Sequence, residues 1–494
     1  MTLLIKNGQI IDGLGRPASK NDVLVKNEKI AAIGNFPRYK ADETIDASGS
    51  YIFPGFIDIN TDSDHYLTLF SHPQQEDFLI QGVTTIVGGQ CGASLAPLIY
   101  GSLDSFKQWT DVAKRNVNWA TFDEFYAVLK QKKFGVNFAT LVGHTTIRQD
   151  IAGETFRNID LPELKILKSV LARSLKEGAF GFSTGLGYNY AHQTNYLELV
   201  ELAKITADNG ALYSTHLRNE KEGILFSVNE TVNLAKKTGV KTLISHFRPL
   251  KGFEKDYEEC LELINKNATE ADIHFDISPT DVSIVAVCAF LPSWLKVKAN
   301  DEKTMLLNLK NREIREKVLK ELPKIKSEET FIVSAPRHEY LAGKTLKSFN
   351  QNRRLTLGEG LLKLIEITEG RAVLFCKNIN IKNVIKALSH EKAIIASNNS
   401  SPSKSLIPDD YPFLKFLKLT EEKKIMTIEK AVHKITGLPA VKLGLKDRGF
   451  VKEGNFADLV VFKSGEIRDV ILNGKIGVKD GHFQNVLSGK ILKR

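Results

Sequence analysis

The feature that most constrains the fold is a repeated alternation of short apolar strands with amphipathic helices through the middle of the chain. The strand-like segments are VTTIVGG, FATLVGH, FGFSTGL, ALYSTHL, TLISHFR, DIHFDIS and KAIIASNN. Repeated β-α units of this size predict a parallel sheet, and their number favours a closed (β/α)8 barrel of the TIM type. An open doubly wound sheet would need a glycine-rich phosphate loop after its first strand, and VGGQCGASLAP is a poor match for one.

Both ends of the chain have a different pattern. Residues 2–53 and the last part of the chain show alternating apolar residues punctuated by NG and DG turns, which is typical of small antiparallel sheets. We therefore expect residues 1–54 and 435–494 to build one β-sandwich domain together. Residues 55–434 would form the barrel, with a lysine-rich helical insertion at about residues 284–345.

Composition excludes several other classes of protein. The net charge of +10 comes from lysines dispersed among glutamates, a pattern that indicates solvated helix faces and not a nucleic-acid surface. No apolar run approaches the roughly 20 residues of a membrane span. The apolar stretch in the first residues, MTLLIKNG, is too short for a secretory signal. The four cysteines show no paired spacing. We expect a cytoplasmic protein with a small-molecule substrate, and the sequence leaves a homo-oligomer open.

Polar residues that end the apolar strands are the candidates for chemistry, because catalytic side chains of such barrels project from the carboxyl ends of strands. They are Asn60, Asp62, Cys91, His144, His216, His246 and Asn398. Thiolate and imidazole ligands suit Zn²⁺, and a catalytic zinc usually has three protein ligands. By residue type Cys91, His216 and His246 form a plausible set, whereas His144 is expected to brace the rim of the barrel.

Nine segments, taken in order, resemble the N-acyl-D-amino-acid deacylase (D-aminoacylase) branch of the amidohydrolase superfamily. They are LIKNGQIIDGLGRP, PGFIDINTDSDHY, QGVTTIVGGQCGASLAPL, LVGHTTIRQDIAG, GAFGFSTGLGY, YSTHLRNE, LISHFRP, GKTL and LPAVKLGLKDRGFVKEGNFADLVVF. The resemblance covers essentially the whole chain and implies a (β/α)8 barrel, a β-sandwich and an inserted subdomain. It also implies hydrolysis of an amide bond in an N-acyl amino acid by a zinc ion held by Cys91, His216 and His246.

Four positions depart from the family pattern. The superfamily's His-x-His motif on the first strand is replaced by Asn60 and Asp62, and Asn398 stands where the family has its proton-transferring aspartate. Ser278 replaces a tyrosine, and Arg248 replaces a lysine. Since asparagine is a poor zinc ligand, we expect one zinc ion per chain, and since an amide accepts no proton near neutral pH, another base is required.

The remaining roles are assigned by residue type. Arg248 or Arg218, with Ser278, would bind a substrate carboxylate or the developing oxyanion. Candidate substitutes for the missing base are Asp62, Asp64, His65, Asp409 and Asp410, although IPDDYP is typical of a solvated turn.

Two other functions stay open. The first is a catalytically lapsed amidohydrolase retained as a binding or assembly scaffold, which would explain the combined loss of chemical groups. The second is a hydantoinase-like enzyme with two metal ions, which the missing strand-one histidines disfavour.

Overall fold

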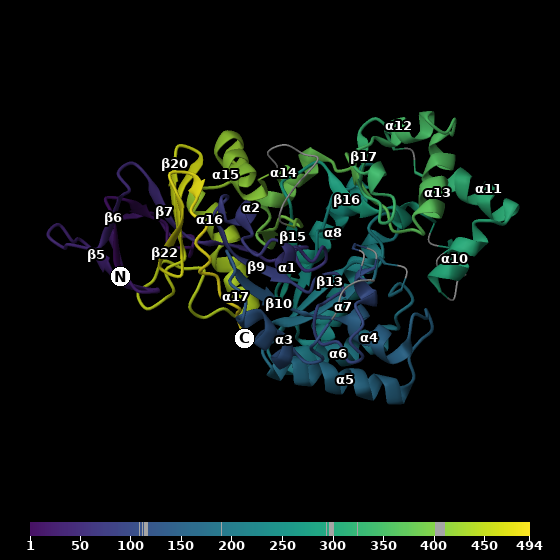
Figure 1. Ribbon diagram of the computed structural model, residues 1–494, viewed down its shortest axis with the longest axis horizontal. Coiled ribbons are helices and arrows are strands. Elements are labelled where there is room, and N and C mark those ends of the chain that lie inside the picture. Colours follow the sequence, from purple (N-terminus) through teal and green to yellow (C-terminus); the bar gives the residue numbers. More distant parts are fainter. Residues whose placement is uncertain are drawn as a thin grey trace.

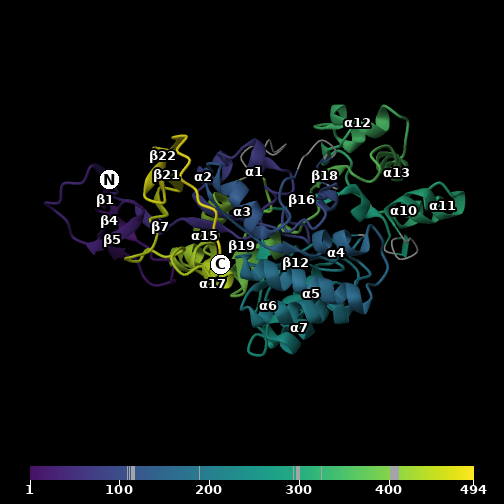
Figure 2. The same cartoon turned by 60° about the horizontal axis from the view of Figure 1, so that its bottom comes forward.

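The computed structural model describes residues 1–107, 109–110, 112, 117–188, 190–292, 294–295, 301–323, 325–400 and 411–494. Sheets built from both ends of the chain lie at one end of the molecule (Figure 1, purple and yellow). A small sheet with its own helices lies at the opposite end, in green, and the β-α units lie between the two; the turned view of Figure 2 shows the same order. No helix among the described residues is long and apolar enough to cross a membrane.

The β-α units form two parallel sheets. The first has the order β10-β9-β8 and the second has the order β11-β12-β13-β14-β15-β19, with every pair in both sheets parallel. The strands of the first sheet are β8 (Phe56–Asp58), β9 (Val83–Gly88) and β10 (Asn137–Thr140). Those of the second are β11 (Val142–Gly143), β12 (Gly181–Gly185), β13 (Leu212–His216), β14 (Lys241–Ile244), β15 (Ile273–Ile277) and β19 (Ala393–Ile395).

Amphipathic helices follow these strands, and all except the last bury apolar residues in one hydrophobic cluster, whereas Ala440 and Leu443 of the last helix belong to a second cluster. Their bounds are α1 (Thr68–Ser71), α2 (Glu76–Leu79), α3 (Phe122–Lys130), α4 (His144–Ala152), α5 (Leu161–Lys176), α6 (Tyr196–Asp208), α7 (Ile224–Thr238), α8 (Glu254–Lys266), α14 (Ile381–Ser389), α15 (Pro412–Lys423), α16 (Ile428–Ile435) and α17 (Gly437–Leu443). Their starts follow local rules: Asp160 caps α5 by accepting from the Glu163 backbone N–H, and a proline stands in the first turn.

The predicted parallel α/β arrangement is confirmed, but strand pairing among the described residues gives two sheets and not one closed ring. Two features bring their edges together. Leu141 alone separates β10 from β11. At the other edge, the Asn398 N–H donates to the Asn60 carbonyl at 3.0 Å, and the Asp62 N–H donates to the Asn399 carbonyl at 2.8 Å. We refer to this second junction as the β19–β8 seam.

Both ends of the chain contribute to one pair of sheets. The order of the first is β5-β4-β1-β6, and the order of the second is β23-β22-β21-β20-β7-β2-β3. Strands from the start of the chain are β1 (Thr2–Lys6), β2 (Gln9–Ile10), β3 (Ser19–Lys20), β4 (Asp22–Lys26), β5 (Lys29–Gly34), β6 (Glu43–Asp46) and β7 (Tyr51–Pro54). Those from its end are β20 (Leu459–Lys463), β21 (Glu466–Leu472), β22 (Lys475–Lys479) and β23 (His482–Phe483). β20 pairs with β7, and one hydrophobic cluster holds Leu3 and Ile5 together with Leu459 and Val461.

The last residues of the chain leave these sheets and return to the parallel strands. The Phe138 N–H donates to the Lys490 carbonyl at 2.9 Å, and the Leu492 N–H donates to the Phe138 carbonyl at 2.8 Å. Residues 489–494 therefore line the outer edge of β10 near its beginning.

A third, antiparallel sheet has a core of its own. Its order is β16-β18-β17, formed by β16 (Ser283–Ala286), β18 (Val373–Cys376) and β17 (Thr330–Ser334). The helices beside it are α10 (Glu302–Asn308), α11 (Arg312–Glu321), α12 (Leu346–Gln351) and α13 (Leu357–Ile367). They share a hydrophobic cluster of residues between Val287 and Cys376, joined by Phe156 and Tyr190, which is separate from the cluster under the parallel sheets.

Candidate metal centre

Three buried side chains that end or follow three strands of the two parallel sheets meet at the carboxyl end of these sheets. Cys91 follows β9, His216 ends β13, and His246 follows β14. One potential ligand atom from each lies within 4.8 Å of the others. The Cys91 Sγ lies 3.3 Å from the His246 Nε2, and the two imidazole rings are 4.3 Å apart at 88°. The sequence-predicted ligand set is thus brought together in space.

The backbone around this cluster adopts unusual conformations. Cys91 has φ of 52°, His246 of 38° and Asn398 of 54°, all in the left-handed region that non-glycine residues rarely adopt. Such conformations cost about 1–3 kcal/mol each and persist where the surrounding structure enforces them, often at functional sites. Gly187 makes room for the cluster, because a Cβ there would lie 2.4 Å from the His216 Nε2.

The donor set fits a soft divalent metal ion. Burial lowers the pKa of His246 to about 4, with His216 adding to the effect, so this imidazole is neutral and able to bind metal at neutral pH. Burial raises the pKa of the Cys91 thiol, and a bound cation is the usual means by which such a thiol is held as thiolate. The His216 Nδ1 is buried and has no hydrogen-bond partner among the described residues. One sulfur and two nitrogen donors suit zinc.

Glu220 links the cluster to Arg248. Its carboxylate accepts two 2.9 Å hydrogen bonds from the Arg248 Nη2 and lies 3.2 Å from the His246 Nδ1. Although burial alone would raise its pKa, Arg248 and His216 hold the pKa of Glu220 well below its usual range. A carboxylate on one imidazole nitrogen leaves the other free for a metal. Sequence reasoning missed Glu220, although it stands in the quoted YSTHLRNE segment.

Tyr188 is a second residue that sequence reasoning missed. Its ring lies 4.7 Å from the His216 ring at 65°, and its side chain hydrogen-bonds to Cys91. Burial, and then Cys91, raise the pKa of Tyr188 well above its usual value, so the phenol keeps its proton. The GFSTGLGY segment contains it, but residue type alone does not separate it from a packing tyrosine.

The two polar residues after β8 are engaged by internal partners. The Asn60 Nδ2 lies 3.2 and 3.3 Å from the two carboxylate oxygens of Asp276, and the Asp62 Oδ1 lies 2.8 Å from the His65 Nδ1. Burial raises the pKa of Asp276 to about 7. Among the described His, Cys, Asp and Glu side chains, Asp62 does not belong to the group whose ligand atoms lie close enough to share a metal ion.

The predicted substrate-binding and base positions separate into two groups. Arg248, Ser278 and Asn398 line one small pocket beside His246. The Arg248 Nε and the Ser278 Oγ are buried there with no hydrogen-bond partner among the described residues. Arg218, by contrast, is held by Glu230 at 2.9 Å and by two backbone carbonyls, so its substrate-binding role stays a prediction.

The other base candidates have different surroundings. Asp64 and His65 are fully buried beside Asp62, and Asp409 and Asp410 lie outside the described residues.

His144 lies away from the cluster, in a buried ionic network. Its Nε2 is 2.7 Å from a Glu198 carboxylate oxygen, which also accepts a 3.1 Å hydrogen bond from the Arg148 Nε. All three side chains are buried. A buried charge pair that joins α4 to α6 fits the bracing role expected of His144.

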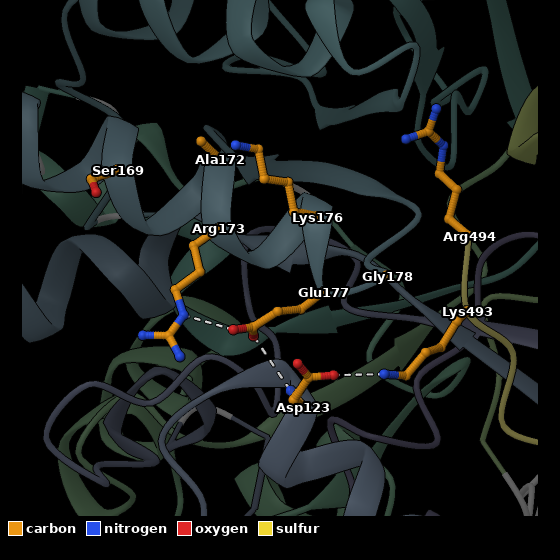
Figure 3. A pocket seen from close by; sticks show the side chains of 9 residues that line it. All are labelled: Asp123, Ser169, Ala172, Arg173, Lys176, Glu177, Gly178, Lys493 and Arg494. Carbon is orange, nitrogen blue, oxygen red and sulfur yellow. Dashed lines mark hydrogen bonds and ion pairs between the residues drawn. The ribbon is translucent and has the colours of Figure 1, made fainter.

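A larger pocket lies at the opposite end of the parallel strands (Figure 3). It sits where α5 ends and β12 is about to begin, next to the last residues of the chain. Two of its cations are already paired, Arg173 with Glu177 and Lys493 with Asp123, each at 2.6 Å. Its place at the amino ends of the strands and these pairings disfavour it as the reaction site.

The curated proteins that match this chain over nearly its whole length include two deacylases. The chain is 28% identical over 474 residues to an N-acyl-D-aspartate deacylase of Alcaligenes xylosoxydans xylosoxydans, a match covering 94% of this chain and 86% of the relative. It is also 28% identical over 478 residues to an N-acyl-D-glutamate deacylase of the same organism, covering 95% and 88%. No family model matches.

Solved structures agree with these sequence matches. A D-aminoacylase described as having a binuclear metal centre superposes with a TM-score of 0.81 at 26% identity, covering 100% of this chain and 99% of that chain. The predicted resemblance is therefore confirmed along the whole sequence. The chain is similar over nearly its whole length to proteins of the N-acyl-D-amino-acid deacylase branch of the amidohydrolases.

Proposed function

We propose that the chain hydrolyses the amide bond of an N-acyl amino acid with a zinc ion held by Cys91, His216 and His246. The observation that carries this proposal is the meeting of those three ligand groups within 4.8 Å, in a chain similar to deacylases over 94% of its length. A catalytically lapsed scaffold is not favoured, because the cluster and its supporting carboxylate are intact. We expect one zinc per chain.

A zinc ion held there would supply a Lewis acid that polarises an amide carbonyl and lowers the pKa of a bound water toward about 7. The residues around it have separate tasks. Glu220 fixes the His246 ring through Nδ1 and so aims Nε2 toward Cys91. Arg248 keeps one buried donor, Nε, free beside the Ser278 hydroxyl, and this pair would bind the substrate carboxylate.

Asp62 is our candidate for the group that takes a proton from the attacking water. It lies across the β19–β8 seam from Asn398, the position without a carboxylate, and its backbone N–H is bonded to the Asn399 carbonyl at 2.8 Å. One of its oxygens, Oδ1, faces His65, which leaves Oδ2 for the reaction. A positioned base contributes about 10²–10⁴-fold to the rate.

We also propose the finer architecture. The two parallel sheets would act as one eight-stranded barrel closed at the β19–β8 seam, which the backbone hydrogen bonds across that seam support. The terminal sheets would form a β-sandwich of residues 1–54 and 435–494 around their shared cluster, and the antiparallel sheet would belong to an inserted subdomain. Four free cysteines support a reducing compartment such as the cytoplasm.

Two measurements on the purified protein test the activity. Elemental analysis should find zinc, and a panel of N-acyl-D- and N-acyl-L-amino acids, followed by release of free amino acid, should show hydrolysis. A Cys91→Ala variant serves as the control for background hydrolysis. Zinc-loaded protein that releases no amino acid from any member of the panel would contradict the proposal.

A further inference from the structure

The turn after β8 holds a histidine between two acceptors. The His65 Nδ1 lies 2.8 Å from the Asp62 Oδ1, and its Nε2 lies 3.2 Å from the backbone carbonyl oxygen of Gln90. A carboxylate and a carbonyl oxygen only accept hydrogen bonds. Both ring nitrogens must therefore carry hydrogen to satisfy the two contacts, which makes the ring an imidazolium.

The surroundings of His65 are built for a cation. Its ring stacks on Trp109 at 4.2 Å and 12°, and the edge of Phe106 lies 5.7 Å away. Beside it, Asp64 is held by the Gly89 N–H at 2.6 Å and by the His65 N–H at 3.0 Å. Burial by itself lowers the pKa of His65, but Asp64 and Asp62 outweigh it and raise the pKa to about 9. A fully buried ring between two carboxylates and an indole face keeps its proton at neutral pH.

This cation is tied directly to the candidate metal centre. Gln90, whose carbonyl faces the ring, precedes the ligand Cys91, and its side chain is fixed by the Ile59 carbonyl at 2.6 Å and the Ser214 hydroxyl at 2.7 Å. On the other side, Asp62 is bonded through its backbone to the β19–β8 seam. His65 thus fixes the position of the Asp62 carboxylate beside the candidate metal centre, although His65 itself does not line the pocket next to His246.

We propose that His65 is a permanent imidazolium that holds Asp62 in place, and that by engaging this carboxylate it keeps a second metal ion from binding there. The inference rests on the proposed function, because it assumes a first metal on Cys91, His216 and His246. The positions that would serve a second ion are occupied: the Asn60 amide is bonded to Asp276, and Asp62 is bonded to His65. His65 is a positioning residue that acts through Asp62.

The first test counts metal ions. Wild-type protein dialysed against excess ZnCl₂ should retain one zinc per chain. In His65→Asn the carboxylates of Asp62 and Asp64 lose their cation and should hold a second zinc, whereas His65→Lys, which restores a positive charge, should return to one. His72→Asn removes an exposed histidine seven residues away and serves as the matched control. Two zinc ions in the wild type, or one in both His65 variants, would overturn the proposal.

The second test needs no variant, in case substitution at this buried position prevents folding. Protein labelled with ¹⁵N-histidine is examined by NMR at pH 8, without and with zinc. One of the eleven histidines should carry hydrogen on both ring nitrogens in either state. Eleven neutral rings at pH 8 would refute a permanent imidazolium. A wild type with no zinc and no hydrolysis would contradict the proposed function, whereas the NMR result reports on His65 alone.

Discussion

Replacing Glu220 by glutamine tests which residues support the candidate metal centre. In our proposal this carboxylate does not itself touch the substrate, although it is bonded to Arg248. It accepts from the Arg248 Nη2 at 2.9 Å, lies 3.2 Å from the His246 Nδ1, and is 3.6 Å from the His216 Nε2. Glutamine keeps the shape of the side chain but has one acceptor oxygen and no charge. The His246 ring then loses the charge that fixes its tautomer.

The expected magnitudes follow from these contacts. Loss of a carboxylate behind a metal-binding histidine typically costs about 10–100-fold in metal affinity, which corresponds to about 1.4–2.7 kcal/mol. The Arg248 guanidinium also loses its counter-charge in a largely buried place, where its side chain is 12% exposed. A hydrogen bond to a charged group contributes about 1.5–3 kcal/mol, so the metal-free protein should also be less stable by about that amount.

Zinc affinity is measured by competition with a coloured chelator, and stability of the metal-free protein by urea unfolding. Glu222→Gln, two residues away and exposed, is the matched control and should change neither quantity. Weaker zinc binding with an unchanged control would support the role of Glu220. If Glu220→Gln bound zinc as tightly as the wild type, the carboxylate would not fix the His246 ring, and the reasoning from its contacts would be refuted.

Three further predictions use different properties. Cys91→Ala should abolish zinc binding and zinc-dependent thermal stabilisation, because two imidazoles bind far more weakly than three ligands, whereas Cys260→Ala, in the core of α8, should lose only packing stability. Asn398→Asp should raise hydrolysis, by less than the about 10²–10⁴-fold of a first positioned base because Asp62 already serves as one, whereas Asn399→Asp should not. Burial raises the pKa of Asp58 from its usual 3.8 to about 7, so the folded state binds one more proton than the unfolded state between these pH values. The free energy of unfolding should therefore fall as pH rises from about 4 to 7. Asp58→Asn should flatten this part of the dependence of stability on pH.

Each of these has an outcome that would contradict it. Unchanged zinc content in Cys91→Ala would return this cysteine to a packing role. A zinc-loaded Asn398→Asp variant without increased hydrolysis would mean that the strand-eight position does not face the attacking water. Equal urea stability of the wild type at pH 4 and pH 7, with the same result for Asp58→Asn, would show that the buried carboxyl keeps an ordinary pKa.

Much of the centre could be predicted because its ligands stand at the ends of recognisable strands. The apolar run before Cys91 became β9, and the runs before His216 and His246 became β13 and β14, so parallel strands bring their carboxyl ends to one edge. Residue type then made these three residues a plausible ligand set for zinc. The family resemblance pointed to the same three residues, and the structure brings them together.

The supporting residues could not be found in the same way. Glu220 and Tyr188 lie in loops after β13 and β12, where the direction of a side chain depends on neighbours distant in sequence, such as Arg248 for Glu220. Arg218 and Arg248 both follow a histidine by two residues, yet Glu230 engages one and Glu220 the other. Which arginine faces the pocket is decided by tertiary packing and not by spacing.

The pairing of the chain's last residues with β10 has a consequence for the order of events during synthesis. β7 lacks its partner β20, and β10 lacks the cover of residues 489–494, until nearly the whole sequence has been translated. Nascent chains fold from the N-terminus onward, and unpaired strand edges are exposed while they wait. The half that carries the candidate metal ligands is thus made about 240 residues before the segment that completes its surroundings. The growing polypeptide must therefore pass through a long stage in which its first sheet has open edges.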